Sequence, residues 1–116
     1  MVIPYARQSI SKQDLDAVAK VLQSDYLTQG PVVPAFEEAV ADLVGAKYAV
    51  AGNSATSMLH VANLALGVTA GDLVWTSPIS FVASANCALY CGAEIDFVDI
   101  DSETFNMSPV ALAAKL

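Results

Sequence analysis

The segment that decides the fold runs from residue 73 to residue 98 and reads Leu73-Val-Trp-Thr-Ser-Pro-Ile-Ser-Phe-Val-Ala-Ser-Ala-Asn-Cys-Ala-Leu-Tyr-Cys-Gly-Ala-Glu-Ile-Asp-Phe-Val98. Two short apolar runs, residues 73–76 and 94–98, flank a stretch with helical spacing at residues 81–90. This order is typical of a right-handed βαβ unit, in which the two strands are parallel. Parallel strands are covered on both faces, which explains why these runs are apolar with little alternation.

The alternation of strand and helix continues on both sides of this segment. Residues 48–51 are a short apolar run that predicts a further strand, and residues 55–66 have helical spacing that stops at Gly67. Pro109 stands where the first turn of a last helix tolerates it. We therefore expect three strands with helices over residues 46–116.

The N-terminal arm, residues 1–45, reads as two amphipathic helices. Ser11 and Asp14 form a capping-box pattern, with Asp in place of Glu, that opens the first helix. Residues 33–44 form the second helix, and Gly45 is its C-terminal stop. The fold class predicted from the sequence is thus α/β, with parallel βαβ units preceded by two helices.

Composition is unusual for so short a chain. Of its 116 residues 55% are hydrophobic and 15% charged, and the mean hydropathy of +0.51 suits a membrane protein or one piece of a larger core. The longest weakly polar stretch, residues 81–93, contains Ser84 and Asn86 and is shorter than the ~20 apolar residues of a spanning helix. The start shows no signal-peptide pattern. We expect a soluble cytoplasmic protein with no membrane partner.

Charge argues against a nucleic-acid partner. Five Lys and Arg stand against twelve Asp and Glu, a net charge of −7. A nucleic-acid surface requires clustered basic residues, and the sequence has none. His60 is the single histidine, and among apolar neighbours it is expected to be a packed or surface residue rather than a catalyst.

Candidate metal ligands are few. Cys87 and Cys91 resemble buried small apolar residues of a reducing compartment, and no second ligand pair accompanies them. Asp99, Asp101 and Glu103 alternate like the start of a calcium loop, but the glycine and the glutamate that such a loop requires are missing. These acids are expected in a solvated turn, and no metal site is predicted.

The turn with chemical potential reads Gly52-Asn-Ser-Ala-Thr-Ser57, between the first expected strand and the next helix. Small residues at a helix N-terminus present unpaired backbone N–H groups, and the helix dipole favours an anion there. The hydroxyls of Ser54, Thr56 and Ser57 can add donors. Ordinary capping by Asn53 or Ser54 explains the same pattern, so the turn is a candidate phosphate site with that alternative open.

A second loop, Trp75-Thr-Ser-Pro-Ile-Ser-Phe81, follows the carboxyl end of an expected parallel strand. Ligands of open α/β sheets bind at that edge. The ring of Phe81 can stack on a planar ligand, although an aromatic residue that opens an apolar helix is commonly part of the core. The glycine motifs of dinucleotide sites and P-loops are absent.

The order and spacing of seven motifs resemble those of the DegT/DnrJ-type nucleotide-sugar aminotransferases. The motifs are Gln29-Gly-Pro, Phe36-Glu-Glu, Gly45-Ala-Lys-Tyr-Ala-Val, Asn53-Ser-Ala-Thr-Ser, Leu66-Gly-Val-Thr-Ala-Gly-Asp, Thr76-Ser-Pro-Ile-Ser-Phe-Val-Ala-Ser-Ala-Asn and Phe97-Val-Asp-Ile-Asp. The resemblance covers residues 3–116. Within the family, the chain looks most like the UDP-4-amino-4,6-dideoxy-N-acetyl-beta-L-altrosamine transaminases of pseudaminic acid synthesis.

The resemblance implies the N-terminal portion of a fold type I transferase that depends on pyridoxal phosphate (PLP). Such an enzyme is a homodimer that moves an amino group from glutamate to the C4 ketone of a UDP-linked deoxy sugar. Carried over by residue, the cofactor phosphate lies at Ala55, Thr56 and Ser57, and Phe81 stacks on the pyridine ring.

The resemblance also implies a wall that faces the sugar nucleotide. Its members here are one residue of the arm, Tyr5, and four residues of a turn-rich segment, Asp25, Tyr26, Leu27 and Thr28.

PLP chemistry needs a lysine that holds the cofactor. The chain has Lys12, Lys20, Lys47 and Lys115, and none stands at the carboxyl end of an expected strand. The resemblance places that lysine, and the aspartate that pairs with the pyridine nitrogen, beyond the end of this sequence. We therefore expect no catalytic residue here and no transamination by these residues alone. The alternative is a non-catalytic, truncated module that self-associates or binds a phosphate ligand, and both readings predict a homo-oligomer.

Overall fold

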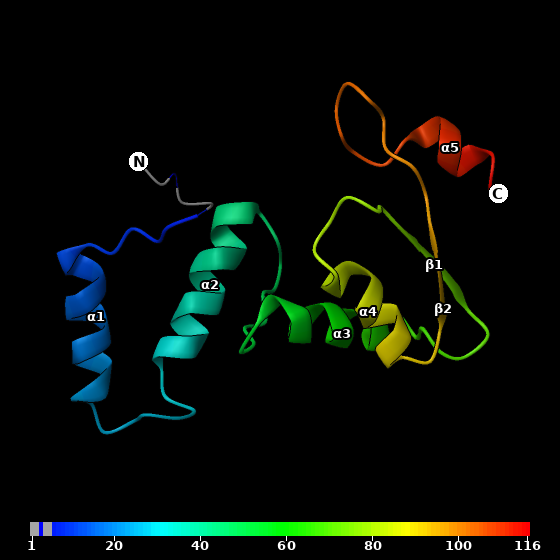
Figure 1. The fold of residues 1–116 in the computed structure, drawn as a ribbon. Coiled ribbons are helices and arrows are strands. Elements are labelled where there is room, and N and C mark those ends of the chain that lie inside the picture. The colour runs from blue at the N-terminus through cyan, green and yellow to red at the C-terminus, as the bar shows by residue number, and fades with distance from the viewer. Residues whose placement is uncertain (1–2, 4–5) are drawn as a thin grey trace. The chain divides into compact units, whose positions relative to one another are not determined.

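The protein forms two compact units, Met1–Ala51 and Gly52–Leu116, drawn as a ribbon in Figure 1. The structure is a computed structural model that describes residues 3 and 6–116. Among these residues, the first unit holds two helices, and the second holds three helices and a parallel sheet.

The helices of the first unit begin and end where the sequence predicts. Helix α1, Lys12–Leu22, starts at a capping box: Ser11 N donates to Asp14 Oδ2 at 2.7 Å, and Asp14 N donates to Ser11 Oγ at 3.2 Å. Helix α2, Val32–Val44, ends at Gly45, which has a left-handed φ of 67°. Glycine adopts that conformation without steric cost, so both helix predictions are confirmed.

The turn between α1 and α2 is tight. Gln29 has a positive φ of 52°, and a Cβ on Gly30 would lie 2.6 Å from Tyr26 Cβ. Because that neighbouring atom is next to the backbone and cannot move away, position 30 requires glycine. The turn thereby sets the direction in which Tyr26 leaves the backbone.

The predicted strand at residues 48–51 is wrong. In the structure the segment has no ladder, and Ala51 N instead donates to Glu37 Oε1 at 2.8 Å. Tyr48 and Val50 are exposed. A strand needs a neighbour for its backbone hydrogen bonds, and in the described part of the chain the two sheet strands pair only with each other. The described sheet therefore has two strands rather than three.

The second unit is a βαβ unit with flanking helices. Its elements in chain order are α3 Ala55–Ala65, β1 Leu73–Thr76, α4 Ala83–Tyr90, β2 Glu94–Phe97 and α5 Pro109–Ala113. Strands β1 and β2 are parallel, with Leu73 opposite Glu94 and Thr76 opposite Phe97. Val98 N extends the ladder by donating to Thr76 O at 3.0 Å. The parallel pair and its crossover helix confirm the prediction.

Small side chains form the core of this unit. In α4 the buried residues are Ala83, Ala85, Cys87 and Ala88, and Val98 is fully buried beyond β2. Alanine at these positions lets the helix backbone approach its neighbours closely, and Figure 1 shows α4 beside α3. Cys87 is buried as expected, and the ring of His60 packs edge-on against Tyr90 with centroids 5.3 Å apart.

The acids after β2 shape a turn. Asp101 Oδ1 accepts N–H groups from Glu103 at 3.1 Å and from Thr104 at 2.8 Å. These bonds favour the ionised carboxyl and lower the pKa of Asp101. Among the described residues no group of three or more His, Cys, Asp or Glu is placed to hold a metal ion, and no helix is long and apolar enough to cross a membrane.

The buried position of Val98 gives a stability prediction. Val98→Ala removes two methyl groups from the core and is expected to lower the free energy of unfolding by about 2 kcal/mol, from lost transfer energy and a residual cavity. Urea unfolding followed through Trp75, the single tryptophan, measures it in the second unit. Val110→Ala, at a side chain 81% exposed, is the matched control and is expected to cost under about 0.5 kcal/mol. Equal losses in the two variants would contradict the described core.

Candidate functional site

The turn before α3 is capped by a serine. Ser54 is extended, with φ −162° and ψ 154°, and its Oγ accepts the N–H of Ser57 at 3.1 Å. The two hydroxyl oxygens, Ser54 Oγ and Ser57 Oγ, are 3.0 Å apart. Ordinary helix capping is thus present at Ser54, one of the two residues that the sequence offered for it.

The cap uses the backbone N–H of Ser57 and leaves other hydrogen-bond donors of this turn without an acceptor. Among the described residues, the N–H groups of Ala55 and Thr56 have no acceptor, and the hydroxyls of Thr56 and Ser57 belong to the same helical turn. No Asp, Glu, Lys or Arg occurs from residue 52 to residue 71, so no carboxylate of this stretch opposes an anion. Two N–H donors, nearby hydroxyls and the positive end of a helix dipole suit a phosphate monoester.

The sequence did not predict the side chain that packs against the start of this turn. A Cβ on Gly52 would lie 2.2 Å from Met58 Sδ and 2.8 Å from Met58 Cγ. The thioether of Met58 therefore packs directly against the backbone that enters the turn, and a larger residue at position 52 would displace it. The available signal was a glycine directly after an apolar run.

The loop after β1 presents the candidate stacking residue. Phe81 precedes α4 rather than opening it, and its side chain is 74% exposed. The ring is therefore outside the core and free to cover a planar ligand. Around it, Ser77 Oγ accepts the N–H of Ile79 at 3.3 Å, and the hydroxyls of Ser80 and Ser84 are 2.9 Å apart.

The helices that follow this loop and the phosphate turn, α4 and α3, pack against each other in the second unit. Helix α4 connects two parallel strands and so starts at the carboxyl end of β1. Helix α3 packs on α4 and leads through residues 66–72 into the start of β1. Figure 1 shows this course of the chain. Ligands of open α/β sheets bind at this edge.

The expected sugar-nucleotide residues belong to the first unit. Tyr5 lies outside the described residues. The other four occupy the tight turn between α1 and α2, and all of them are exposed; they are Asp25, Tyr26, Leu27 and Thr28. Exposed aromatic and polar side chains on a turn are suited to contact a ligand.

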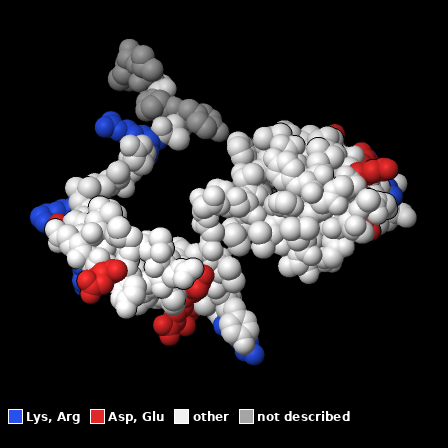
Figure 2. All heavy atoms as spheres, turned by 90° about the horizontal axis from the view of Figure 1, so that it is seen from below, with Lys and Arg blue, Asp and Glu red and all other residues white. Residues whose placement is uncertain are grey.

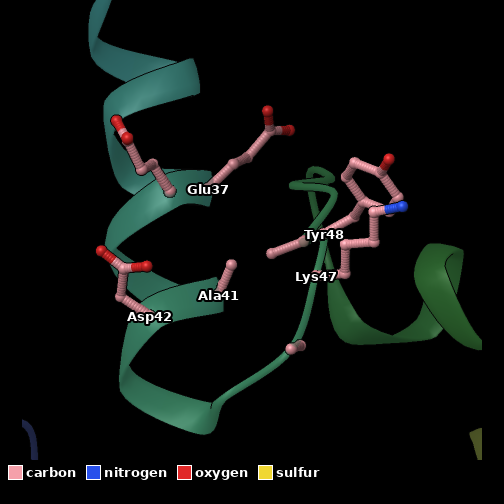
Figure 3. A pocket seen from close by; sticks show the side chains of 8 residues that line it. Glu37, Ala41, Asp42, Lys47 and Tyr48 are labelled. Carbon is pink, nitrogen blue, oxygen red and sulfur yellow. The ribbon is translucent and has the colours of Figure 1, made fainter.

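A hollow of about 340 Å³ in the first unit has a different character (Figure 3). Its lining combines three acids of α2, Glu37, Glu38 and Asp42, with Lys47 and Tyr48. Figure 3 shows Glu37 directed toward the segment of Tyr48, and the Lys47 ammonium lies 5.1 Å from the centre of the Tyr48 ring. Three carboxylates oppose an anion, so this hollow is not a phosphate site.

None of the four lysines belongs to the phosphate turn. Lys12 pairs with Asp16 at 2.6 Å on α1, and Lys115 donates to Asp96 Oδ2 on β2. The same Asp96 oxygen accepts the indole N–H of Trp75 at 3.3 Å. The Lys115 hydrogen bond is the main reason that the pKa of Asp96 is lowered. Lys115 is thus occupied in tying the end of the chain to the sheet.

The charged side chains of the second unit are confined to two parts of the chain. All its acids fall within residues 72–103, and its one basic residue other than His60 is Lys115. Figure 2 shows the result on one face, where acids gather at an edge and most of the surface carries no charge. Residues 52–71, which include the phosphate turn, carry no Asp, Glu, Lys or Arg, so the helix dipole is the main field that this stretch itself supplies.

Residues 8–116 match the model of the DegT/DnrJ/EryC1/StrS aminotransferase family. The chain belongs to this family. It is 44% identical over 114 residues to the spore coat polysaccharide biosynthesis protein SpsC of Bacillus subtilis. The aligned region covers 98% of the chain and 29% of SpsC. The chain is 43% identical over 115 residues to the UDP-4-amino-4,6-dideoxy-N-acetyl-beta-L-altrosamine transaminase of Campylobacter jejuni, covering 99% of the chain and 30% of the transaminase.

The solved structures agree on the fold of this family member. The PLP form of Streptococcus pneumoniae Spr1654, assigned as a sugar aminotransferase, matches with a TM-score of 0.92 at 28% identity, over 98% of the chain and 29% of that structure. The chain therefore has the fold of the N-terminal portion of a fold type I PLP-dependent transferase. It spans about 30% of the length of the relatives it matches, and PLP is the cofactor expected for the family.

The Lys115–Asp96 contact gives a prediction about pH. The folded pKa of Asp96 is lowered, so the contact contributes stability above the usual carboxyl pKa of ~4 and loses it as the pH falls through the folded pKa. Lys115→Gln is expected to raise the pKa of Asp96, read from its carboxyl carbon by NMR titration. Lys12→Gln, which breaks an exposed pair on α1, is the matched control and is expected to leave Asp96 unchanged. An unaltered Asp96 titration in Lys115→Gln would show that the contact is absent in solution.

Proposed function

We propose that this chain supplies the cofactor-phosphate turn, the ring-stacking aromatic and part of the sugar-nucleotide wall of a PLP-dependent aminotransferase. The observation that carries the proposal is the first turn of α3, where the N–H groups of Ala55 and Thr56 have no acceptor among the described residues. Because the chain belongs to an aminotransferase family, the phosphate of PLP is the ligand expected for these donors.

Each residue has a distinct role in this proposal. When bound, PLP supplies the electron sink that amino transfer requires. The N–H groups of Ala55 and Thr56 donate to the phosphate, and the hydroxyls of Thr56 and Ser57 add donors at the same helix end. The exposed ring of Phe81 covers one face of the planar cofactor and excludes water from it.

For the substrate, we propose a UDP-linked deoxy sugar with a C4 ketone, and glutamate as the amino donor. The name of the Campylobacter jejuni relative supports the sugar class, because it is a transaminase of a UDP-linked 4-amino-4,6-dideoxy sugar. Tyr5 and the turn residues Asp25, Tyr26, Leu27 and Thr28 are the proposed contacts to the sugar nucleotide. In that turn Gln29 has a positive φ of 52°, and Gly30 packs closely against Tyr26.

Complete amino transfer requires more than these residues. The chain spans 29–30% of two aminotransferase-family relatives, and none of its four lysines falls within residues 52–57. We propose that the lysine and the aspartate of the cofactor site belong to the part of the relatives that this chain does not span. These 116 residues then bind cofactor through its phosphate without transaminating.

A second candidate function is a self-associating module without catalysis. Many large apolar side chains are exposed in both units, among them Leu43, Leu66 and Val110. Large exposed apolar side chains are a common feature of association surfaces. It supports a homo-oligomer under either proposal.

Titration with PLP and with inorganic phosphate tests the site. In two-dimensional NMR spectra, both ligands are expected to shift the amide signals of Ala55, Thr56 and Ser57 selectively. Thr56→Ala removes one hydroxyl donor and is expected to weaken phosphate binding several-fold, because one charge-assisted hydrogen bond is lost. Thr69→Ala, at an exposed threonine of the turn after α3, is the matched control and should bind as the wild type does. Shifts spread over both units, or equal weakening in the two variants, would refute a site at this turn.

Borohydride reduction separates binding from catalytic competence. After incubation with PLP and reduction, the 116-residue chain is expected to carry no stoichiometric adduct at a single lysine, because Lys12 and Lys115 are engaged by carboxylates and Lys20 and Lys47 are exposed. Peptide mass spectrometry measures the adduct. One defined, complete modification would overturn the proposal that the cofactor lysine lies outside this chain.

A further inference from the structure

The loop that carries Phe81 is joined to the first turn of α4 by two serines, Ser80 and Ser84, here called the serine pair. Their hydroxyl oxygens are 2.9 Å apart, within hydrogen-bond distance. Ser84 also donates its backbone N–H to Phe81 O at 2.9 Å. Ser84 therefore holds two consecutive residues of the loop, Ser80 through its side chain and Phe81 through its backbone.

Helix α4 begins without an ordinary side-chain cap. Its N-cap residue is Val82, whose side chain has no atom that accepts a hydrogen bond. The serine pair joins the loop to the helix at the place where a cap residue would do so. The helical member of the pair is firmly placed, because its two neighbours, Ala83 and Ala85, are buried in the core of the second unit.

The ring of Phe81 is not held by packing. Its side chain is 74% exposed, so its direction depends on the backbone that carries it. Earlier in the loop, Pro78 has a fixed φ angle, and Ser77 Oγ accepts the N–H of Ile79 at 3.3 Å. Together with the serine pair, these constraints order the segment that ends at the exposed ring.

We propose that the serine pair positions the ring of Phe81 for stacking on the planar part of the cofactor. A loop that is already ordered loses less conformational entropy when a ligand binds, so the pair increases affinity without contacting the ligand. The proposal rests on the proposed function, in which Phe81 stacks on PLP. It adds two positioning residues, Ser80 and Ser84, which act through Phe81.

Titrations with PLP and with inorganic phosphate isolate this role, because inorganic phosphate has no ring on which Phe81 can stack. Both ligands are added to the 116-residue chain, and affinity is read from the amide signal of Thr56. Ser80→Ala is expected to weaken PLP binding about two- to tenfold, the range for one lost hydrogen bond, and to leave phosphate binding unchanged. Ser80→Thr keeps the hydroxyl and is expected to bind PLP as the wild type does. Ser102→Ala, at an exposed serine of the turn after β2, is the matched control.

A double-mutant cycle with Phe81→Ala tests whether Ser80 acts through the ring. Once the ring is absent, adding Ser80→Ala is expected to cause no further loss of PLP affinity. A further loss of the same size shows that Ser80 contacts the ligand itself and overturns the positioning role. A Ser80→Ala variant that binds PLP like the wild type, or that loses PLP and phosphate binding equally, also overturns it.

Amide exchange in the ligand-free chain tests the serine pair without any cofactor. Because the N–H of Ser84 donates to Phe81 O, Ser80→Ala is expected to speed the exchange of that amide by about twofold or more, whereas Ser102→Ala is not. Unchanged exchange in Ser80→Ala overturns the proposal. If PLP does not shift residues 55–57 of the wild type, the proposed function fails, while faster exchange in Ser80→Ala still shows that the pair holds the loop. The two failures are therefore distinguishable.

Discussion

Close packing of a small-residue helix against its neighbours is the constraint on which the second unit depends. Ala83, Ala85 and Ala88 of α4 are buried, and Ala88 is fully so, because the helix is packed against β1, β2 and α3. Alanine allows this close approach at the least entropic cost to a helix. The packing fixes the direction of α3 and α4 relative to the strands. It thereby holds α3 alongside α4, the helix that follows the loop with Phe81.

The elements that local pattern specifies were predictable. The capping box at Ser11, the glycine stop at Gly45 and the βαβ order from β1 to β2 depend on residues close in sequence, and all appear in the structure. The strand prediction for residues 48–51 was wrong for the opposite reason. Their apolar run satisfies the pattern of a strand, but a strand also needs a distant partner, and pattern alone does not supply one. Ala51 N meets Glu37 instead.

The candidate site also has features that the local sequence predicted and features that it did not. The helix N-terminus and its hydroxyls follow from the local sequence, and the structure sharpens them by assigning the Ser57 N–H to the cap and leaving those of Ala55 and Thr56 without an acceptor. The Met58 thioether beneath Gly52 did not follow, because its position depends on a rotamer. Phe81 had two readings, core or stacking surface, and its side chain lies outside the core formed by the described residues. Its role toward a cofactor still rests on the family.

The high mean hydropathy has a physical meaning in this fold. A chain with a mean hydropathy of +0.51 that buried its apolar residues would have a large core. Here the core is made of small side chains, and many large apolar side chains remain exposed. Burial of a large apolar side chain is worth about 1.5–3 kcal/mol, so leaving many exposed forgoes most of the driving force for folding. That energy becomes available only when another surface covers them. Any surface that covers these side chains would therefore add to the stability of the chain.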